Sequence, residues 1–405
     1  MQKARALLCL FLFVSLLFPL SMGGCQDART EETTDANTDQ TTQNLTERTE
    51  QPTMNETTIT TPQEKTNTPT NPIELVANTY DFCKNREHFK RYGRMLEKTS
   101  GLTCDFTASG VEFCGKMVGD VVVSLSCSAD TYFTVFIDGV RQEERFYATS
   151  ATKQLCIASF AEAGEHTVRM VKQTEAQWSL CLLESVSITG FLYPAPTDRE
   201  FLIEFIGDSL TSGYGNLGDS STPVAGIALM QDGTQTYAFL TAEALDVDYN
   251  MVSCSGIGIA KGWTAVNEID FYQKSCYYRS DSVYHNDNSR IPDVIVINLG
   301  TNDQDRGCDE ASFKAGVKEL IAYLRAFYGA EVPIVWAYDM MSYGCFTWAR
   351  PVLAELGGER AGIYTVQLTR NNAGAGHHPA LEGHYKSSEQ LVQFILDKKL
   401  LDKVN

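Results

Sequence analysis

The sequence predicts a β-sandwich or jelly-roll domain over residues 73–196, followed by a doubly wound α/β domain over residues 197–405. Between residues 73 and 196, six short apolar segments are separated by turn signals, a spacing typical of sandwiches and jelly rolls. From Arg199 onward, strand-length and helix-length apolar patterns alternate, which indicates a parallel sheet. The continuous apolar run Val294 to Asn298 suits a parallel strand covered on both faces.

The first 24 residues have the layout of a secretory signal peptide. Lys3 and Arg5 precede the apolar run Leu7 to Leu20, and small residues follow it. About 14 apolar residues fall short of the ~20 that span a bilayer, which argues against a membrane anchor. Cys25 follows Met22-Gly23-Gly24, an arrangement similar to a bacterial lipoprotein box. We therefore expect an extracellular protein, either secreted or lipid-anchored through Cys25.

Residues 25–72 predict a disordered, Thr-rich tether. They are rich in Thr, Asn, Glu, Gln and Pro and contain no aromatic residue, so they cannot bury enough apolar surface to fold. The whole chain of 405 residues is 43% hydrophobic, and its formal net charge is −18. Such a charge repels phosphate backbones. Nucleic acid is therefore excluded as a partner, and no stable protein partner is implied.

Cysteine content predicts disulfides. Of the twelve cysteines, Cys9 lies in the signal and Cys25 at its edge, which leaves ten from Cys83 to Cys345. An even number in an exported protein favours disulfide formation, although spacing does not define the pairs. Cys127 and Cys254 lie inside apolar runs, where a buried free thiol is an equally good interpretation.

Local patterns predict the individual elements. Asp138-Gly139 is a hairpin signal in the first domain. The expected strands there are Val111 to Phe113, Val121 to Cys127, Tyr132 to Ile137, Arg145 to Ala148, His166 to Val171 and Ser185 to Ile188. The second domain is expected to contain strands at 201–206, 248–252, 294–298, 332–338 and 363–368, and amphipathic helices at 309–328 and 387–400.

The stretch Phe201 to Gly215 contains a candidate nucleophile. Its apolar run, Phe201 to Ile206, ends in Gly207-Asp208-Ser209, which puts Ser209 at the carboxyl end of a buried strand. In open α/β sheets, ligands bind at this edge, and glycine allows the backbone to turn tightly there. A serine hydroxyl in such a place could act as a nucleophile, although Asp or Ser after a strand also serves as a helix cap.

A serine nucleophile needs a base that takes its proton. Of six histidines, three lie in the loop Gly374 to His384, which follows the last predicted strand and so emerges at the same sheet edge: His377, His378 and His384. With Glu382 they could bind a metal. Their spacing matches no helical histidine pair, however, so we expect no metal site and no cofactor.

Two further strand ends carry candidate hydrogen-bond donors for an oxyanion. Gly256 follows the strand near Asp248 to Val252, and its backbone N–H can be approached closely. Asn302 lies in Gly300-Thr301-Asn302-Asp303 after the Val294 strand, and its amide can donate without carrying charge. Donors aimed at a developing negative charge are what acyl transfer requires. Ordinary βα turns use the same residue types.

Four segments, taken in chain order, resemble the four sequence blocks of the SGNH (GDSL) hydrolases. They are Gly207-Asp208-Ser209, Gly256, Gly300 to Asp303 and His378-Pro379. The resemblance extends to the two-domain, acetylxylan-esterase-like enzymes of carbohydrate esterase family 2 and covers the chain from about residue 80 to residue 400. It implies an SGNH-type, flavodoxin-like sheet. In the first domain, the segments similar to that family's jelly roll are Gly93-Arg94, Tyr132-Phe133, Ile137-Asp138-Gly139 and Gly164 to Val168.

The resemblance implies a role for each site residue. Ser209 would be the nucleophile and His378 the base, and the oxyanion hole would consist of the Ser209 N–H, the Gly256 N–H and Asn302. Many SGNH enzymes have an acid two residues before the histidine, where this chain has Gly376. A Ser-His dyad is therefore expected, with a backbone carbonyl orienting the imidazole. His377 stands where the family often has a tryptophan that stacks on substrate.

The function implied is an exported carbohydrate O-acetylesterase acting on plant polysaccharides or oligosaccharides of the xylan or glucomannan type. One alternative keeps the fold and changes the acyl group, as in a lipid or peptidoglycan esterase. Another is a non-catalytic carbohydrate-binding protein. That alternative predicts the loss of Ser209, Asn302 or His378, and all three are present.

Overall fold

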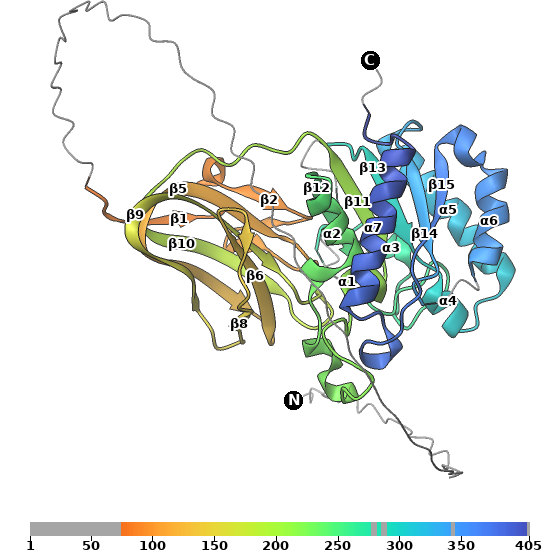
Figure 1. Ribbon diagram of the computed structural model, residues 1–405, viewed down its shortest axis with the longest axis horizontal. Helices are drawn as coiled ribbons and strands as arrows, with labels where there is room; N and C mark the ends of the chain where they lie inside the picture. The colour runs from red at the N-terminus through yellow and green to blue at the C-terminus, as the bar shows by residue number, and fades with distance from the viewer. Residues whose placement is uncertain (1–73, 277–281, 285–289, 342–344, 403–405) are drawn as a thin grey trace, which may run out of the picture. The chain divides into compact units, whose positions relative to one another are not determined.

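The computed structural model describes residues 74–276, 282–284, 290–341 and 345–402. The predicted signal peptide, Cys25 and the tether lie outside these residues. Residues 70–405 belong to one compact unit, in which antiparallel strands precede alternating strands and helices (Figure 1). Across the described ranges, no helix is long and apolar enough to cross a membrane. The boundary at 196 stays a prediction, and here the last antiparallel strand ends at Leu192 and the first parallel strand begins at Leu202.

The N-terminal part, hereafter the β-domain, is one curled antiparallel sheet of ten strands. Its central strand is long and pairs with two other long strands, one on each side. The strands are β1 (Ala77–Asp81), β2 (Lys90–Tyr92), β3 (Glu97–Lys98), β4 (Gly101–Thr103), β5 (Gly110–Cys127), β6 (Thr131–Ile137), β7 (Val140–Arg141), β8 (Phe146–Ala148), β9 (Gln154–Lys172) and β10 (Cys181–Leu192), and η1 (Arg86–His88) is a short 3-10 helix.

The prediction of only short strands is wrong for the centre of this sheet. The two strands expected around Phe113 and Val123 are the two ends of β5. Gly119, with φ of +71°, sits at a register shift between β5 and β9. A bulge of this kind bends a strand without ending it. The Asp138-Gly139 hairpin is confirmed, because both residues have positive φ and join β6 to β7.

None of the ten cysteines in the described ranges forms a disulfide. Most are buried at separate places in the two domains, where a thiol packs as a small apolar side chain. Cys127 and Cys181 come nearest to a pair. They lie opposite each other on β5 and β10, with their Sγ atoms 3.7 Å apart.

The C-terminal part, hereafter the α/β domain, contains a five-stranded parallel sheet in the order β12-β11-β13-β14-β15, the flavodoxin-like order. The predicted strands are confirmed. Its elements are β11 (Leu202–Gly207), α1 (Ser209–Ser212), η2 (Val224–Leu229), η3 (Gly233–Gln235), α2 (Tyr237–Ala244), β12 (Asp248–Ser253), α3 (Glu268–Tyr272), β13 (Val294–Asn298), α4 (Thr301–Asp305), α5 (Glu310–Tyr328), β14 (Ile334–Tyr338), α6 (Phe346–Glu355), η4 (Gly358–Ala361), β15 (Ile363–Gln367), η5 (Ala375–His377) and α7 (Leu381–Asp397).

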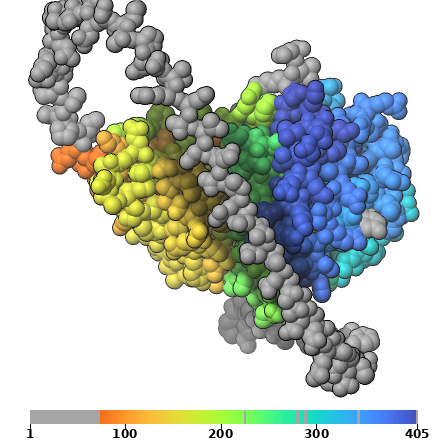
Figure 2. Space-filling view, in the orientation of Figure 1, coloured from red at the N-terminus to blue at the C-terminus, as the bar shows by residue number. Residues whose placement is uncertain are grey.

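The last helix begins earlier than predicted. It starts at Leu381, two residues after Pro379, so Ser387 lies inside the helix and not at its start. The stretch Leu381 to Lys386 is polar and contains Gly383, which weakens any helical pattern. Packing decides the outcome here, since α7 lies against α2 and buries His384. Figure 2 shows α7, in the darkest blue, beside the green surface of the segment that contains α2.

Helices cover both faces of the parallel sheet. Successive residues of a strand point to opposite faces, and Phe205 and Ile206 on β11 belong to two separate apolar clusters. Phe205 packs with residues of α2 and α7, and Ile206 packs with residues of α3, α5 and α6 (Figure 1). The carboxyl ends of the strands remain uncovered by these layers, which leaves that edge for a site.

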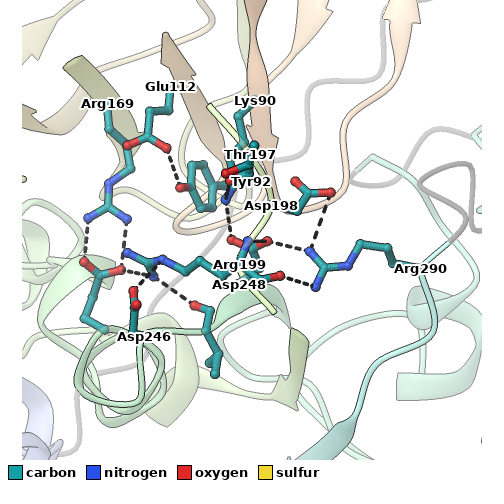
Figure 3. A network of polar contacts seen from close by, with 12 residues as sticks. Lys90, Tyr92, Glu112, Arg169, Thr197, Asp198, Arg199, Asp246, Asp248 and Arg290 are labelled. Carbon is teal, nitrogen blue, oxygen red and sulfur yellow. Dashed lines mark hydrogen bonds and ion pairs between the residues drawn. The ribbon is translucent and has the colours of Figure 1, made fainter. Parts of the chain in front are cut away.

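A network of charged side chains joins the two domains at the amino ends of the parallel strands (Figure 3). Lys90 of β2 lies 2.7 Å from a carboxylate oxygen of Asp248, the first residue of β12. Arg290 pairs with the same carboxylate. Arg169 of β9 donates two hydrogen bonds to Glu243 of α2, the bidentate arrangement that gives both strength and direction.

A buried ion pair reaches further into the α/β domain. Arg94, between β2 and β3, donates to Glu204 of β11 at 3.0 Å, and neither side chain is exposed. Arg94 also packs on the ring of Tyr272, and the hydroxyls of Tyr272 and Tyr328 donate to Glu204. A buried charge is tolerated only with such partners. The β-domain therefore supplies the counter-charge for the strand that leads to Ser209.

Candidate active site

Ser209 lies just beyond the carboxyl end of β11, an inner strand of the parallel sheet. β11 ends at Gly207, Asp208 caps the short helix α1, and Ser209 is the first residue of that helix. The backbone N–H of a first helical residue has no acceptor within the helix. Gly207 is required because a Cβ there would lie 2.1 Å from Thr211 Oγ1. Ser209 is 5% exposed, so its hydroxyl faces a confined space.

His378 meets this serine directly. Its Nε2 lies 2.8 Å from Ser209 Oγ, and its Nδ1 lies 3.0 Å from the carbonyl oxygen of Gly376. A carbonyl can only accept a hydrogen bond, so Nδ1 carries the proton and Nε2 is free to accept the serine proton. The position that bears an acid in many related enzymes thus contributes its main-chain oxygen. Gly376 has φ of +59°, a conformation that glycine adopts without strain.

The other candidates from this loop lie elsewhere. His384 is buried on α7, where its Nδ1 accepts the N–H of Tyr237 at 3.2 Å, and burial lowers the pKa of His384 to about 3. His377 is exposed. Glu382 is exposed and pairs with Lys386. Among the residues that the structure describes, no group of three His, Cys, Asp or Glu side chains is placed to hold a metal ion.

The two candidate oxyanion donors line the same cavity as Ser209 and His378. Gly256 follows β12 with φ of +84°, and a Cβ there would approach Trp263 Cβ to 3.0 Å. Asn302 lies on α4, just after β13. Its Nδ2 is 2.9 Å from Ile257 O and 3.1 Å from Asp208 Oδ2, so the amide is held on both sides. Its role toward an oxyanion remains a prediction.

Two buried aspartates support these donors, a role that the sequence did not reveal. Asp303 accepts hydrogen bonds from the N–H groups of Ile259, Ala260 and Lys261 and so holds the loop that follows Gly256. Asp208 accepts from Leu210 N and from Asn302. Burial raises the pKa of Asp208 to about 7.

The cavity above Ser209 has a volume of about 320 Å³ and an aromatic rim. Trp263 is 65% exposed, and its indole N–H donates to Asp305 while Arg306 covers its ring. Trp178 lies across from it and stacks on Tyr214. A hollow of about 390 Å³ lies at the opposite edge of the sheet, around Asp248. Its lining contains no serine, cysteine or histidine.

Sequence reasoning missed Glu175 and Trp178, which come from the β-domain. Both lie between β9 and β10, in the segment Gln173 to Ser179. The only local signal was a tryptophan in a polar, turn-like stretch. Nothing in that pattern places the segment beside a serine of another domain.

A serine hydroxyl bonded to an imidazole at the carboxyl edge of a flavodoxin-like sheet, with candidate donors after the two neighbouring strands, defines a serine hydrolase of the SGNH type. The comparisons with known families agree. Residues 205–379 match the GDSL-like Lipase/Acylhydrolase family, and residues 92–196 match the Carbohydrate esterase 2 N-terminal family. The chain therefore contains a GDSL-like hydrolase domain, preceded by a domain similar to the N-terminal domain of carbohydrate esterase family 2.

Relatives of known activity cover parts of the chain. The protein named Cellulase/esterase CelE from Acetivibrio thermocellus is 28% identical over 328 residues, which are 74% of this chain and 38% of that protein. An Acetylxylan esterase / glucomannan deacetylase from Cellvibrio japonicus is 38% identical over 153 residues, which are 35% of this chain and 40% of that protein. The matched regions are thus less than half of either relative.

Solved structures show the same two-domain fold. A family two carbohydrate esterase from Clostridium thermocellum in complex with cellohexaose is 27% identical, with a TM-score of 0.67 over 77% of this chain and 99% of that one. A family two carbohydrate esterase from Cellvibrio japonicus has a TM-score of 0.71 at 19% identity, over 80% of this chain and 99% of that one.

Proposed function

We propose that the protein is an exported carbohydrate O-acetylesterase that removes acetyl groups from polysaccharides or oligosaccharides of the xylan or glucomannan type. The observation that carries this proposal is the contact of 2.8 Å between Ser209 Oγ and His378 Nε2. It lies at the floor of a cavity that a sugar ester can enter. The Gly376 carbonyl presets the tautomer that such chemistry needs.

The reaction follows from this geometry. Ser209 Oγ attacks the acetyl carbonyl carbon while its proton moves to His378 Nε2. The negative charge on the carbonyl oxygen is stabilised by the N–H groups of Ser209 and Gly256 and by the Asn302 amide, which exchanges one of its two acceptors, Asp208 Oδ2 or Ile257 O, for the oxyanion. When the carbon–oxygen bond to the sugar breaks, His378 gives the proton to the departing hydroxyl. Water, activated by the same imidazole, then releases acetate and restores the serine.

The rim of the cavity supports a sugar substrate. Trp178 and Trp263 line the same cavity as Ser209 and present exposed indole surface, and flat apolar surface of this kind suits the faces of pyranose rings. One relative named above is an acetylxylan esterase / glucomannan deacetylase, and one of the solved structures is a complex with cellohexaose. Export is proposed from residues 1–25 alone, and the intact mass of the mature protein would distinguish cleavage from lipidation at Cys25.

The test is hydrolysis of a chromogenic aryl acetate beside acetylated xylan, acetylated glucomannan and acetylated peptidoglycan. The proposal expects turnover of the aryl acetate and faster deacetylation of the plant glycans than of peptidoglycan. Preference for peptidoglycan, or for aryl esters of long fatty acids, would select the alternative acyl substrate. Binding of the glycans without release of acetate from any ester would favour a carbohydrate-binding protein.

Asn302→Ala should lower kcat by about 10² to 10³ with little change in KM, since its donor is used mainly when charge develops on the carbonyl oxygen. Steady-state kinetics on aryl acetate measures both constants. Asn298→Ala is the matched control. It removes a buried amide at the end of β13 that contacts Met340 and Tyr237 and does not line the cavity, so most turnover should remain. A rise in KM alone would move Asn302 from the oxyanion hole to substrate binding.

The pH profile should show a base that stays neutral below the usual range. Burial lowers the pKa of His378 from its ordinary value of 6.5, and hydrogen bonding to the backbone opposes the shift only in part. Because only the neutral imidazole accepts the serine proton, kcat/KM should hold to below pH 6.5 and fall at lower pH. Burial raises the pKa of Asp208 to about 7, so its titration could also contribute to the profile. The acid limb of kcat/KM should persist in Asp208→Asn if it reports His378. An acid limb centred above pH 6.5 would contradict this prediction.

A further inference from the structure

We propose that Glu175 of the β-domain is a positioning residue of the active site, holding the oxyanion loop with one carboxylate oxygen and the aromatic wall with the other. The inference rests on the proposed esterase function. It makes the β-domain a working part of the catalytic centre. Nothing in the sequence blocks assigns this role, because Glu175 lies outside the α/β domain that carries them.

The first contact fixes the oxyanion loop. Glu175 Oε2 accepts the backbone N–H of Ser255 at 2.7 Å, and Ser255 immediately precedes Gly256. The direction of the Gly256 N–H depends on the backbone torsions of Ser255, so anchoring Ser255 sets where that donor points. A donor contributes to catalysis only when it is aimed at the developing charge. Glu175 therefore acts on the reacting atoms through Gly256.

The second contact fixes the wall beside the base. Glu175 Oε1 accepts the indole N–H of Trp178 at 2.8 Å. Trp178 stacks on Tyr214, with ring centroids 6.0 Å apart, and Tyr214 packs edge-on against the His378 imidazole at 4.9 Å. One carboxylate thus connects a substrate-facing indole, the base and the oxyanion loop.

Burial explains why a carboxylate suits this place. The Glu175 side chain is fully buried, and burial raises its pKa while the hydrogen bonds it accepts oppose the shift. An ionised carboxylate offers two acceptor oxygens, whereas an amide offers one acceptor and places donor hydrogens against the other partner. The main chain is held as well, because Gln231 accepts the Glu175 N–H and donates to Ser212 O of α1.

The test compares Glu175→Gln and Glu175→Ala with wild type by two readouts. The first is the rate at which a fluorophosphonate labels Ser209, a step that forms an Oγ–P bond, expels fluoride and uses the oxyanion hole whatever the natural acyl group. The second is kcat and KM on aryl acetate and on acetylated xylo-oligosaccharide. We expect the glutamine variant to lose roughly tenfold in labelling rate and in kcat, and the alanine variant about 10²-fold.

Trp178→Phe tests the contact of Glu175 with the aromatic wall apart from its contact with Ser255, since it keeps a ring but removes the indole donor. It should raise KM for the oligosaccharide several-fold and slow the labelling of Ser209 less than Glu175→Gln does, because the contact to Ser255 remains. Tyr92→Phe is the matched control, because it removes one partly buried hydrogen bond, to Glu112, away from the residues that line the active-site cavity. A merely structural Glu175 would lower Tm as Tyr92→Phe does and leave labelling unchanged.

The outcomes remain distinguishable from those of the proposed function. If wild type is labelled at Ser209 but hydrolyses no acetate, the acetylesterase proposal fails, and a slower labelling of the Glu175 variants still supports the positioning role. If wild type hydrolyses acetate and a folded Glu175→Gln matches it within twofold in labelling and kcat, the positioning role is overturned. The glutamine variant decides the matter if the alanine variant does not fold.

Discussion

Ser209→Ala should abolish ester hydrolysis while leaving the fold intact. The hydroxyl oxygen is the atom that forms the covalent intermediate, and it bonds with His378 Nε2. Removing an acyl-enzyme nucleophile costs ~10³-fold or more in kcat. The side chain adds little to packing, so thermal unfolding should barely change. Release of acetate from aryl acetate and from acetylated xylan measures the loss.

The control for this substitution is Ser388→Ala. Ser388 is also a buried serine of the α/β domain, 6% exposed against 5% for Ser209, but its hydroxyl bonds with Thr241 between α7 and α2. Its loss should affect stability slightly and turnover hardly at all. If Ser209→Ala kept more than a tenth of the wild-type rate, Ser209 could not be the nucleophile.

His378→Ala should be nearly as damaging as Ser209→Ala, because a nucleophile and its base act as a unit and either loss removes the same step. The double variant should therefore lose little beyond either single one. Steady-state kinetics on aryl acetate measures all three. His377→Ala should retain substantial turnover, because His377 is exposed and makes no contact that the proposed reaction uses.

Glu382→Gln tests whether a carboxylate orients the base. In a full triad, replacing the acid costs about 10⁴ in kcat. Here the Nδ1 proton goes to the Gly376 carbonyl and Glu382 pairs with Lys386, so less than a tenfold change is expected. A loss of ~10³ in kcat in a folded Glu382→Gln variant would mean that Glu382 is the acid of a full triad.

His384→Ala should lower stability, since His384 is buried and its Nδ1 accepts the N–H of Tyr237. If the variant folded but had no activity, His384 and not His378 would be the base.

The elements around the site were predictable because their signals are local. The apolar run of β13, the five-strand alternation and the amphipathic face of α5 each follow from short-range patterns. The rule that ligands bind at the carboxyl edge then placed Ser209, Asn302 and the last loop at one edge. That rule predicts which edge of the sheet carries the site, but it does not predict the distances between the side chains there. Choosing His378 among three histidines needed the family resemblance, and the structure shows why the others differ: His384 is on the inward face of α7.

What could not be predicted depends on contacts between segments distant in sequence. The early start of α7 follows from its packing on α2, which outweighs the weak local propensity around Gly383. The continuity of β5 depends on a bulge, and a glycine in a strand pattern reads equally well as a turn. Glu175 has no sequence signal at all. Its role in the site depends on its hydrogen bond with the backbone N–H of Ser255, a residue of the other domain.

The Arg94–Glu204 pair has a consequence for how such enzymes can be inherited. Glu204 sits in the middle of β11, an inner strand of the parallel sheet, with no exposed surface, and its counter-charge belongs to the β-domain. A gene fragment encoding only the α/β domain would produce a carboxylate buried without a cation, a loss worth several kcal/mol, about 3 to 5. Recombination that separates the two domains is therefore penalised unless residue 204 changes as well. A fragment that contains only the α/β domain should therefore be less stable than the two-domain protein, and a substitution of Glu204 by an apolar residue should reduce the difference.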